Sequence, residues 1–458
     1  MGKLFYILLF IVQTTSSIYS QKNTVIANNK QDYEYFLDFF STRNKQVHEK
    51  SLSYIKNNWS DHFEAIAIES LYFLRNPSTS EKLLNILQKN TKKYYRYDFN
   101  KWYEYIWNKD STYQGSYYTF KAALHKGLDA RFEHYFLDRQ DLSTIRLDEV
   151  RWGGVIQDGI PPLRNPKMIS AKQAKYLADT DIVFGIAVQG DIRAYPKRIL
   201  AWHEMFTDRV GNIPVAGVYC TLCGTVILYK TQKDGVNYQL GTSGFLYRSN
   251  KLMYDQKTQS LWNTLWGKPV IGPLVNQGIE LEYLSVVTTT WGEWKKRHPE
   301  TKVLSLRTGH TRNYNEGEAY KDYFTTDELM FSVPGVDTRL KNKQEILAIR
   351  LPEETDENIA ISSKFLRKQK IYQSTINNKN FTVFTDVSGA HRVYFTKDIE
   401  FVFYDQNTKA KDGNGEVWHV KENHLEHATT HQKLTRMSTH NAFWFGYQAA
   451  FPKTKLIK

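Results

Sequence analysis

The sequence predicts an α+β protein with an N-terminal helical domain and a C-terminal β-rich domain. Apolar residues recur at helical spacing from about residue 32 to residue 134. Near Leu142 the pattern changes to short β-branched runs separated by Gly and Pro, which is typical of strands and turns. Several motifs of the second part occur twice. These observations divide the chain into residues 1–20, 21–144 and 145–458.

Residues 1–20 have the organisation of a secretory signal peptide. Lys3 precedes an apolar stretch from Leu4 to Val12, and small polar residues then lead to a cleavage point after Ser20. The apolar stretch is shorter than the about 20 residues that span a bilayer, and no later stretch approaches that length. We therefore expect an exported protein, periplasmic or secreted, without a transmembrane segment.

Residues 21–144 are expected to form stacked helix pairs, loosely like a HEAT array, although no strict repeat period emerges. Apolar positions such as Ala67, Leu71 and Leu74 fall on one helical face, and polar breaks such as residues 75–79 separate the helices. The domain is rich in aromatic residues between Tyr94 and Trp107. These side chains either fill the core or form a face that binds a partner.

The charge composition limits the classes of partner. The chain carries 61 Lys and Arg residues against 48 Asp and Glu residues, but the basic residues are scattered and form no stripe. Together with export, this argues against nucleic acid and leaves a small molecule, a glycan or a protein as the partner. Phosphate loops and dinucleotide fingerprints are absent from the sequence, so no nucleotide cofactor is expected.

The β-rich domain is predicted to contain two tandem degenerate repeats, about residues 180–306 and 345–458. Three motifs recur in the same order: VYCTLCGTVILY with VFTDVSGAHRVY, YDQKT with YDQNT, and TWGEWKKRHPETKVL with FWFGYQAAFPKTKLI. Features that both repeats keep are expected to serve the fold. Features of one repeat alone are candidates for function.

The only two cysteines, Cys220 and Cys223, occur in the first repeat, where the second has Thr385 and Ser388. Apolar runs flank them on both sides, so the pair is expected in a tight turn between strands, with Gly224 at a positive φ. This arrangement resembles the metal knuckle of rubredoxins and zinc ribbons more than a thioredoxin motif, which opens a helix.

His203 is the expected third ligand, because it lies on the apolar face of a short helix just before the cysteine strand. Two thiolates and one imidazole suit a copper or zinc ion with an open position, as in an oxidoreductase. Glu204, next to His203, is expected to point elsewhere on the helix, which argues against a zinc deaminase. His298 is a further candidate neighbour, since Phe451 replaces it in the second repeat.

Two alternatives remain for the cysteines. They form a local disulfide in a non-enzymatic periplasmic binding or scaffold protein, or they are inert thiols. If the site is catalytic, Ser243, Tyr247, Arg248 and Asn250 are substrate-facing candidates, because they lie on a segment that only the first repeat contains. His424, His427 and His431 have ligand-like spacing but are expected in a solvated loop.

The β-rich part resembles a known bacterial family, the domain of unknown function 3179, over residues 145–458. The motifs that carry the resemblance are DGIPPL, GDIRAYPKRILAWHE, VYCTLCGT, TSGFLYRSNKLMYDQKTQSLW and TTTWGEWKKRHPETKVL. The family usually has Pro after the first cysteine of the turn, where this chain has Thr221. The resemblance implies a domain boundary near residue 145 and no particular reaction.

Overall fold

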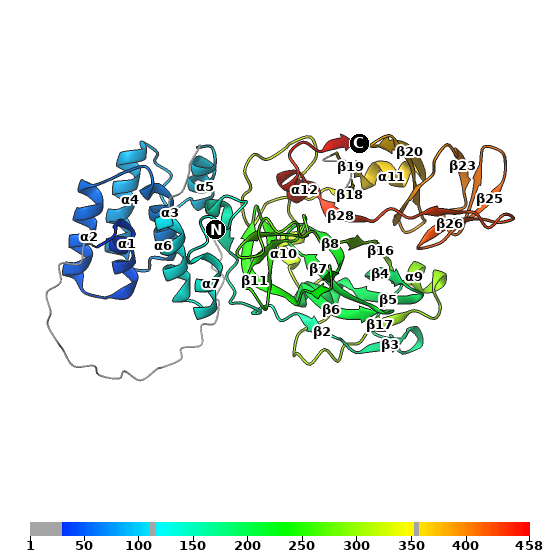
Figure 1. The fold of residues 1–458 in the computed structure, drawn as a ribbon, viewed down its shortest axis with the longest axis horizontal. Helices are drawn as coiled ribbons and strands as arrows, with labels where there is room; N and C mark the ends of the chain where they lie inside the picture. The colour runs from blue at the N-terminus through cyan, green and yellow to red at the C-terminus, as the bar shows by residue number, and fades with distance from the viewer. Residues whose placement is uncertain (1–29, 110–114, 352–356) are drawn as a thin grey trace.

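The computed structural model describes residues 30–109, 115–351 and 357–458. The predicted signal peptide, residues 1–20, lies outside the described residues. The predicted α+β class is confirmed, because helices form the N-terminal part and β-sheets dominate the remainder (Figure 1). Within the described ranges, no helix has the length and hydropathy needed to cross a membrane.

The N-terminal domain is a set of packed helices. They are α1 (Asp32–Ser41), α2 (Lys45–Asn57), α3 (Phe63–Phe73), α4 (Pro77–Thr91), α5 (Phe99–Trp107), α6 (Gly115–Lys126) and α7 (Glu133–Phe136). The predicted break at residues 75–79 coincides with the start of α4, where the Asn76 side chain accepts the Thr79 N–H and Pro77 occupies the first turn. Trp102 and Trp107 are buried, whereas Tyr94 and Tyr97 are exposed, so the aromatic residues divide between core and surface.

The first half of the β-rich domain contains three five-stranded sheets. Their orders are β16-β4-β5-β17-β3, β15-β8-β7-β6-β2 and β1-β11-β12-β13-β14. The strands are β1 (Val150–Trp152), β2 (Leu163–Arg164), β3 (Met168–Ser170), β4 (Ile182–Val188), β5 (Asp191–Pro196), β6 (Met205–Val210), β7 (Ile213–Cys220), β8 (Thr225–Lys230), β11 (Leu240–Tyr247), β12 (Asn250–Asp255), β13 (Leu261–Asn263), β14 (Lys268–Ile271), β15 (Tyr283–Leu284), β16 (Val287–Thr290) and β17 (Lys302–Leu304). A small pair, β9 (Gln232–Lys233) and β10 (Val236–Asn237), and the helices α8 (Lys197–His203) and α9 (Trp291–Arg297) complete this half.

The second half also has three sheets, ordered β28-β18-β19-β29, β20-β21-β22 and β23-β24-β25-β26-β27. Its elements are β18 (Glu345–Arg350), β19 (Asn358–Ser362), α11 (Ser363–Gln369), β20 (Ile371–Ile376), β21 (Lys379–Thr385), β22 (His391–Phe395), β23 (Phe401–Tyr404), β24 (Lys409–Asp412), β25 (Val417–Val420), β26 (His424–His427), β27 (Lys433–Thr435), β28 (Thr439–Phe443), α12 (Trp444–Ala450) and β29 (Lys455–Ile457). In the first of these sheets, β29 runs parallel to β19 and the other pairs are antiparallel. The sheet β16-β4-β5-β17 of the first half has the same pattern, because β17 runs parallel to β5 and the other pairs are antiparallel.

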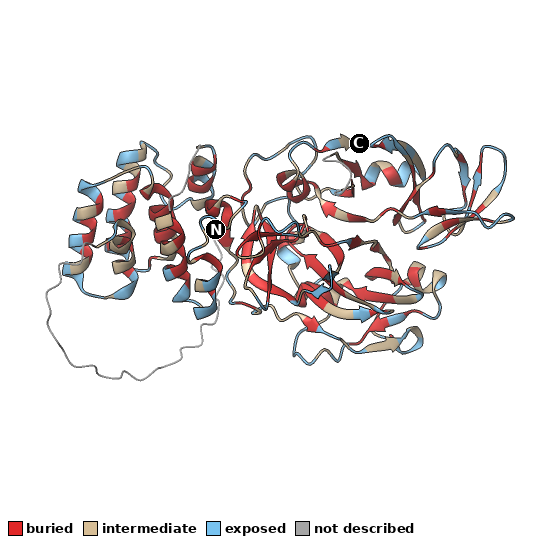
Figure 2. Cartoon of the chain, in the orientation of Figure 1, coloured by how far each residue is buried: buried red, intermediate tan, exposed pale blue. Residues whose placement is uncertain are grey.

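Two connections position the candidate site. The helical domain packs on β11 through aromatic rings, with the Phe245 centroid 4.8 Å from that of Phe132 and 5.1 Å from that of Phe136. Figure 2 shows buried residues continuing from the helices into the adjoining sheet. The segment between the two halves contains α10 (Lys321–Phe324), and its residues Tyr320 and Phe331 lie beside the cysteine turn. The turn also packs against Leu246 of β11 and against Phe445 and Ala449 of α12.

Candidate thiol site

The cysteines lie in the hairpin that joins β7 to β8. Cys220 ends β7 and pairs with Thr225, the first residue of β8. Gly224 has a φ of 56°, and a Cβ at this position would come within 2.7 Å of the Phe443 ring. The predicted turn between strands, with Gly224 at a positive φ, is confirmed.

Both cysteines are free thiols and both are buried. The Cys223 sulfur lies 3.2 Å from the Ser249 carbonyl oxygen and within hydrogen-bonding reach of the Cys220 sulfur. Burial alone would raise the pKa of Cys220, but hydrogen bonds from the Cys223 thiol and from the Lys251 backbone N–H bring it below the usual thiol value. Burial and the neighbouring Cys220 raise the pKa of Cys223. Cys220 is thus the more acidic thiol. The single Cys223 S–H donates to the Ser249 carbonyl oxygen and lies within reach of a Cys220 thiolate.

Glu204 points in a different direction from His203, as expected, but its carboxylate faces the cysteine turn, which the sequence interpretation did not predict. Helix α8 ends at His203, and Glu204 takes a left-handed conformation with a φ of 53°. This reversal of the chain directs its carboxylate toward the turn. Glu204 Oε1 accepts hydrogen bonds from Thr221 Oγ1 at 2.8 Å and from the Tyr320 hydroxyl at 2.7 Å, and its Oε2 is paired with Lys251 Nζ.

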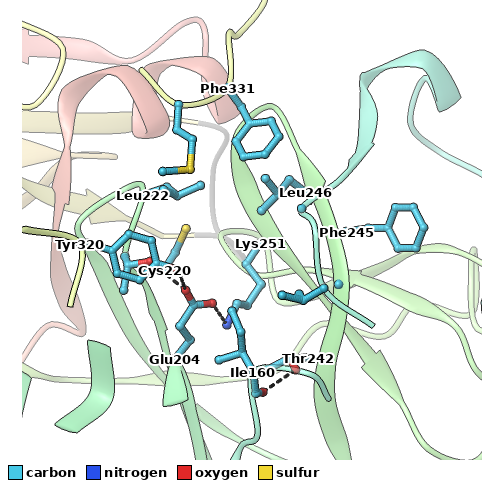
Figure 3. A pocket seen from close by; sticks show the side chains of 15 residues that line it. Ile160, Glu204, Cys220, Leu222, Thr242, Phe245, Leu246, Lys251, Tyr320 and Phe331 are labelled. Atoms are coloured by element: carbon cyan, nitrogen blue, oxygen red, sulfur yellow. Dashed lines mark hydrogen bonds and ion pairs between the residues drawn. The ribbon is translucent and has the colours of Figure 1, made fainter. Parts of the chain in front are cut away.

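A cavity of about 60 Å³ lies against this cluster. Its polar lining includes Glu204, Thr221, Thr242, Lys251 and Tyr320, and Cys220 lies on the same wall. Its apolar lining comes from Val155, Ile160, Leu222, Phe245, Leu246, Met330 and Phe331. Figure 3 shows Cys220 between Leu222 and Glu204, with Lys251 reaching the Glu204 carboxylate from the opposite side. The cavity has room for a few water molecules or a small ligand.

His203, the expected third metal ligand, is fully buried but does not line this cavity. Its Nδ1 lies 2.8 Å from the Pro161 carbonyl oxygen and its Nε2 lies 2.6 Å from the Tyr314 hydroxyl. Both ring nitrogens are therefore engaged, and burial lowers the pKa of His203 to about 4. In the parts of the chain that the structure describes, no group of three or more His, Cys, Asp or Glu side chains is placed to hold a metal ion.

Of the four substrate-facing candidates, only Asn250 approaches the cysteines. It lies beside Cys223, and its buried side-chain nitrogen and oxygen have no hydrogen-bond partner among the described residues. Ser243 Oγ donates to the Leu252 carbonyl oxygen at 2.7 Å across an irregular part of β11. Arg248 donates from Nε to Glu149 at 2.5 Å and from Nη1 to the Ala449 carbonyl oxygen at 2.8 Å. Tyr247 is also hydrogen bonded to Glu149. Ser243, Tyr247 and Arg248 thus hold the hairpin in place.

The other histidines lie away from this cavity. His298 Nε2 is 3.2 Å from Glu422 Oε1, in a buried charged cluster between the two halves. His424 and His431 contact Glu426 at 3.2 and 3.1 Å, and the His427 Nδ1 accepts backbone N–H groups of the turn after β26. The expected solvated loop is a β-hairpin formed by β26 and β27.

The sequence interpretation missed Glu204, Lys251 and Tyr320 as members of the site. Lys251 adjoins Asn250 in the segment that only the first half contains, so its position was a usable signal. Glu204 could have been recognised as a residue beyond the helix end if α8 had been given its observed length of seven residues. Tyr320 lies in an irregular segment 116 residues from Glu204, and no local pattern indicates that contact.

The fold and the cavity define an α+β protein with a buried dithiol site. The chain matches the family model described as "Protein of unknown function (DUF3179)" over residues 157–454, and it belongs to this family. The match includes the cysteine turn, Glu204, Lys251 and Tyr320. No curated protein and no solved structure matches the chain.

Proposed function

We propose that this protein is an oxidoreductase whose cysteine pair reduces a small hydroperoxide, with Cys220 as the attacking thiolate and Cys223 as the resolving thiol. The observation that carries the proposal is that Cys220 borders a small cavity while Cys223 lies beside it, buried and within hydrogen-bonding reach. One sulfur can meet a substrate and the other can reach only its neighbour. This is the arrangement of an attacking and a resolving cysteine.

The reaction begins when the Cys220 thiolate attacks the terminal oxygen of the hydroperoxide. An S–O bond forms, the O–O bond breaks, and the alkoxide leaves with a proton as the alcohol. Cys223 then attacks the Cys220 sulfenic acid, which forms the Cys220–Cys223 disulfide and releases water. The two thiols lose two electrons and the peroxide gains them. An external thiol reductant returns the disulfide to the dithiol.

The neighbouring polar groups suit the proton transfer. The Lys251 ammonium and the Tyr320 hydroxyl both line the cavity. The ammonium has donors beyond its pair with Glu204 and can donate to the leaving oxygen, whereas the Tyr320 O–H donates to Glu204. Glu204 holds both of these groups and Thr221 as well, so it fixes their positions. The apolar side chains opposite limit the space to a small substrate and strengthen these polar contacts.

A Cys223→Ser variant tests the assignment of the two thiols. Hydrogen peroxide should convert Cys220 to a sulfenic acid that cannot be resolved, because the second thiol is gone. Mass spectrometry after dimedone treatment should find the adduct on Cys220 in this variant, and a disulfide in the wild type. Recovery of unmodified Cys220 after peroxide treatment of the folded variant would contradict the proposal.

A second candidate function is metal binding by the same pair, as expected for a copper- or zinc-dependent oxidoreductase. The observation that favours it is the knuckle conformation, with Gly224 at a positive φ and both sulfurs on one turn. Between the two ions this arrangement favours copper(I), which soft thiolates select, because zinc requires a set of four ligands. For His203 to bind the ion, one of its ring nitrogens would have to give up its hydrogen bond with the Pro161 carbonyl oxygen or with the Tyr314 hydroxyl.

Copper(I) binding has a direct test in a competition titration with a chromogenic copper(I) chelator. The wild type should withdraw about one ion per chain, and Cys220→Ser and Cys223→Ser should both abolish this. His203→Ala should leave it unchanged if the two sulfurs are sufficient. No withdrawal of copper by fully reduced wild type would exclude this function.

Three further features belong to the proposal. The matching strand orders and pairing senses of the two halves support a tandem duplication, in which the second half kept the fold without the thiols. The paired packing of α1 with α2 and of α3 with α4 supports a HEAT-like arrangement. The signal-peptide pattern of residues 1–20 supports export. In an oxidising compartment the Cys220–Cys223 disulfide can form, and a non-enzymatic binding protein with this local disulfide is the alternative to an oxidoreductase.

A further inference from the structure

A second pocket, larger than the thiol cavity, lies between the two halves of the β-rich domain. It has a volume of about 520 Å³. The first half contributes Lys230, the β9 turn and residues 280–283, and the second half contributes Arg350, Phe395 and residues 436–438. Arg350 ends β18, and Arg436 lies between β27 and β28. Two arginines from separate segments therefore line one pocket.

The Arg350 side chain is only 5% exposed, yet much of its hydrogen-bonding capacity is unused. Its guanidinium packs 4.7 Å from the Tyr283 ring centroid and 5.6 Å from that of Phe451. Within residues 30–109, 115–351 and 357–458, its Nε and Nη2 have no hydrogen-bond partner. The facing carboxylate, Glu280 Oε1, lies 3.8 Å from Nη1, beyond hydrogen-bonding distance.

The Arg436 side chain is also 5% exposed, and part of its hydrogen-bonding capacity is likewise unused. Its guanidinium lies 5.2 Å from the Tyr394 ring centroid, and Nη1 donates to the Tyr394 hydroxyl and the Glu422 carbonyl oxygen, each at 3.3 Å. Among the described residues its Nε and Nη2 also lack a partner. Aromatic packing thus holds both arginines, and their Nε and Nη2 groups, which have almost no solvent-accessible surface, are left without a partner among the described residues.

Three carboxylates line the pocket, Asp234, Glu280 and Glu282, and two of them are paired with lysines at its edge. Glu280 Oε1 has no hydrogen-bond partner among the described residues. Glu280 Oε2 pairs with Lys268 at 2.7 Å, and Glu282 pairs with Lys230 at 3.4 Å. Glu422, which lies 3.6 Å from Arg436, is shared with Arg297 and Arg392. A buried donor that stays unpaired destabilises the fold, and more so when it is charged, so each such group needs an explanation.

We propose that this pocket binds a small molecule through an oxyanion, a carboxylate or a phosphate group, to which Arg350 and Arg436 donate hydrogen bonds. The guanidinium fork matches both groups and can bind them through two parallel hydrogen bonds. Lys233 adds a positive charge in the pocket lining, while the rings of Tyr283 and Phe395 supply apolar walls for the rest of the ligand. This site is distinct from the thiol cavity and does not depend on its chemistry.

Isothermal titration calorimetry of the full mature chain with sodium phosphate and, separately, with sodium acetate tests the proposal at constant ionic strength set with sodium chloride. The wild type should bind one of these probes at one site per chain. Arg350→Lys and Arg436→Lys keep the charge but lose the fork, so each should weaken binding about ten-fold or more. Arg339→Lys is the matched control, because Arg339 lies outside the pocket and pairs with Asp337.

The two probes separate the two sources of the oxyanion, since stronger phosphate binding indicates a phosphorylated ligand and stronger acetate binding a carboxylate. Phenylglyoxal labelling of the wild type gives a second measurement that does not require a folded variant. The bound anion should protect Arg350 and Arg436 from modification and leave Arg339 reactive. Failure of the wild type to bind either probe, or wild-type affinity in both pocket variants, would overturn the proposal.

Discussion

Replacing Cys220 with serine should lower the rate of hydroperoxide consumption by at least about a thousand-fold, equivalent to about 4 kcal/mol of transition-state stabilisation. The reason is chemical, because the thiolate is the nucleophile and a serine hydroxyl does not ionise near neutral pH. Cys220 is 2% exposed, and serine has nearly the same shape. The variant should therefore fold.

The measurement is the disappearance of hydrogen peroxide in the presence of a thiol reductant, with the free-thiol count followed in parallel. Thr385→Ser is the matched control, because Thr385 ends β21 as Cys220 ends β7 and a serine keeps its hydroxyl near His391 Nδ1. This control should keep the wild-type rate. A Cys220→Ser rate within ten-fold of wild type would show that another group carries the reaction.

The pH dependence gives a second readout of the same assignment. The pKa of Cys220 is lowered, so the thiolate forms at a lower pH than in a free cysteine. The rate should rise with pH and reach its plateau below the ordinary thiol pKa of about 8.5. In Cys223→Ser a hydroxyl group replaces the thiol that lies beside the Cys220 sulfur. A shift of the pH–rate profile in this variant would identify Cys223 as the group that stabilises the Cys220 thiolate.

The local features of the site could be predicted from sequence because they depend on neighbouring residues. Two apolar runs around Cys220 and Cys223 are sufficient to indicate strands on both sides of a turn, and Gly224 is the residue that permits its positive φ. The break before α4 follows in the same way from the capping side chain of Asn76 and from Pro77. Each of these signals lies within five residues of the feature it predicts.

The members of the cavity were harder to predict because a one-residue change at a helix end reverses a side-chain direction. If α8 continued, Glu204 would point away from the cysteines, but its left-handed conformation turns the carboxylate toward Thr221. His203, still helical, is directed to Pro161 and Tyr314. Tyr320 reaches the site from a segment without periodicity. Such contacts are set by tertiary packing, which local spacing does not encode.

Replacing Glu422 with glutamine should lower the free energy of unfolding by about 3–5 kcal/mol, the cost of breaking a buried ion pair. Glu422 Oε1 accepts from Arg392 Nε and Arg297 Nε at 2.9 Å each, and these guanidinium groups are almost fully buried. Glutamine removes the negative charge while leaving these cations in place. Urea unfolding at pH 7 measures the loss. Glu345→Gln is the control, because its pair with Arg367 is exposed and worth at most about 1 kcal/mol.

Comparing the free energy of unfolding of the wild type and Glu422→Gln at several pH values shows how the stabilisation by Glu422 depends on pH. Burial alone would raise the pKa of Glu422, but Arg392, the hydrogen bond with His298 and the other arginines bring it well below its usual value. Its stabilisation is therefore complete above the unfolded-state pKa of about 4.3 and is lost as the pH falls through the lower folded-state pKa. The stability difference between wild type and Glu422→Gln should stay constant from pH 7 to 5 and decrease in more acidic buffers. A difference that increased on acidification, or one below about 1 kcal/mol at pH 7, would mean that the arginines around Glu422 do not require its charge.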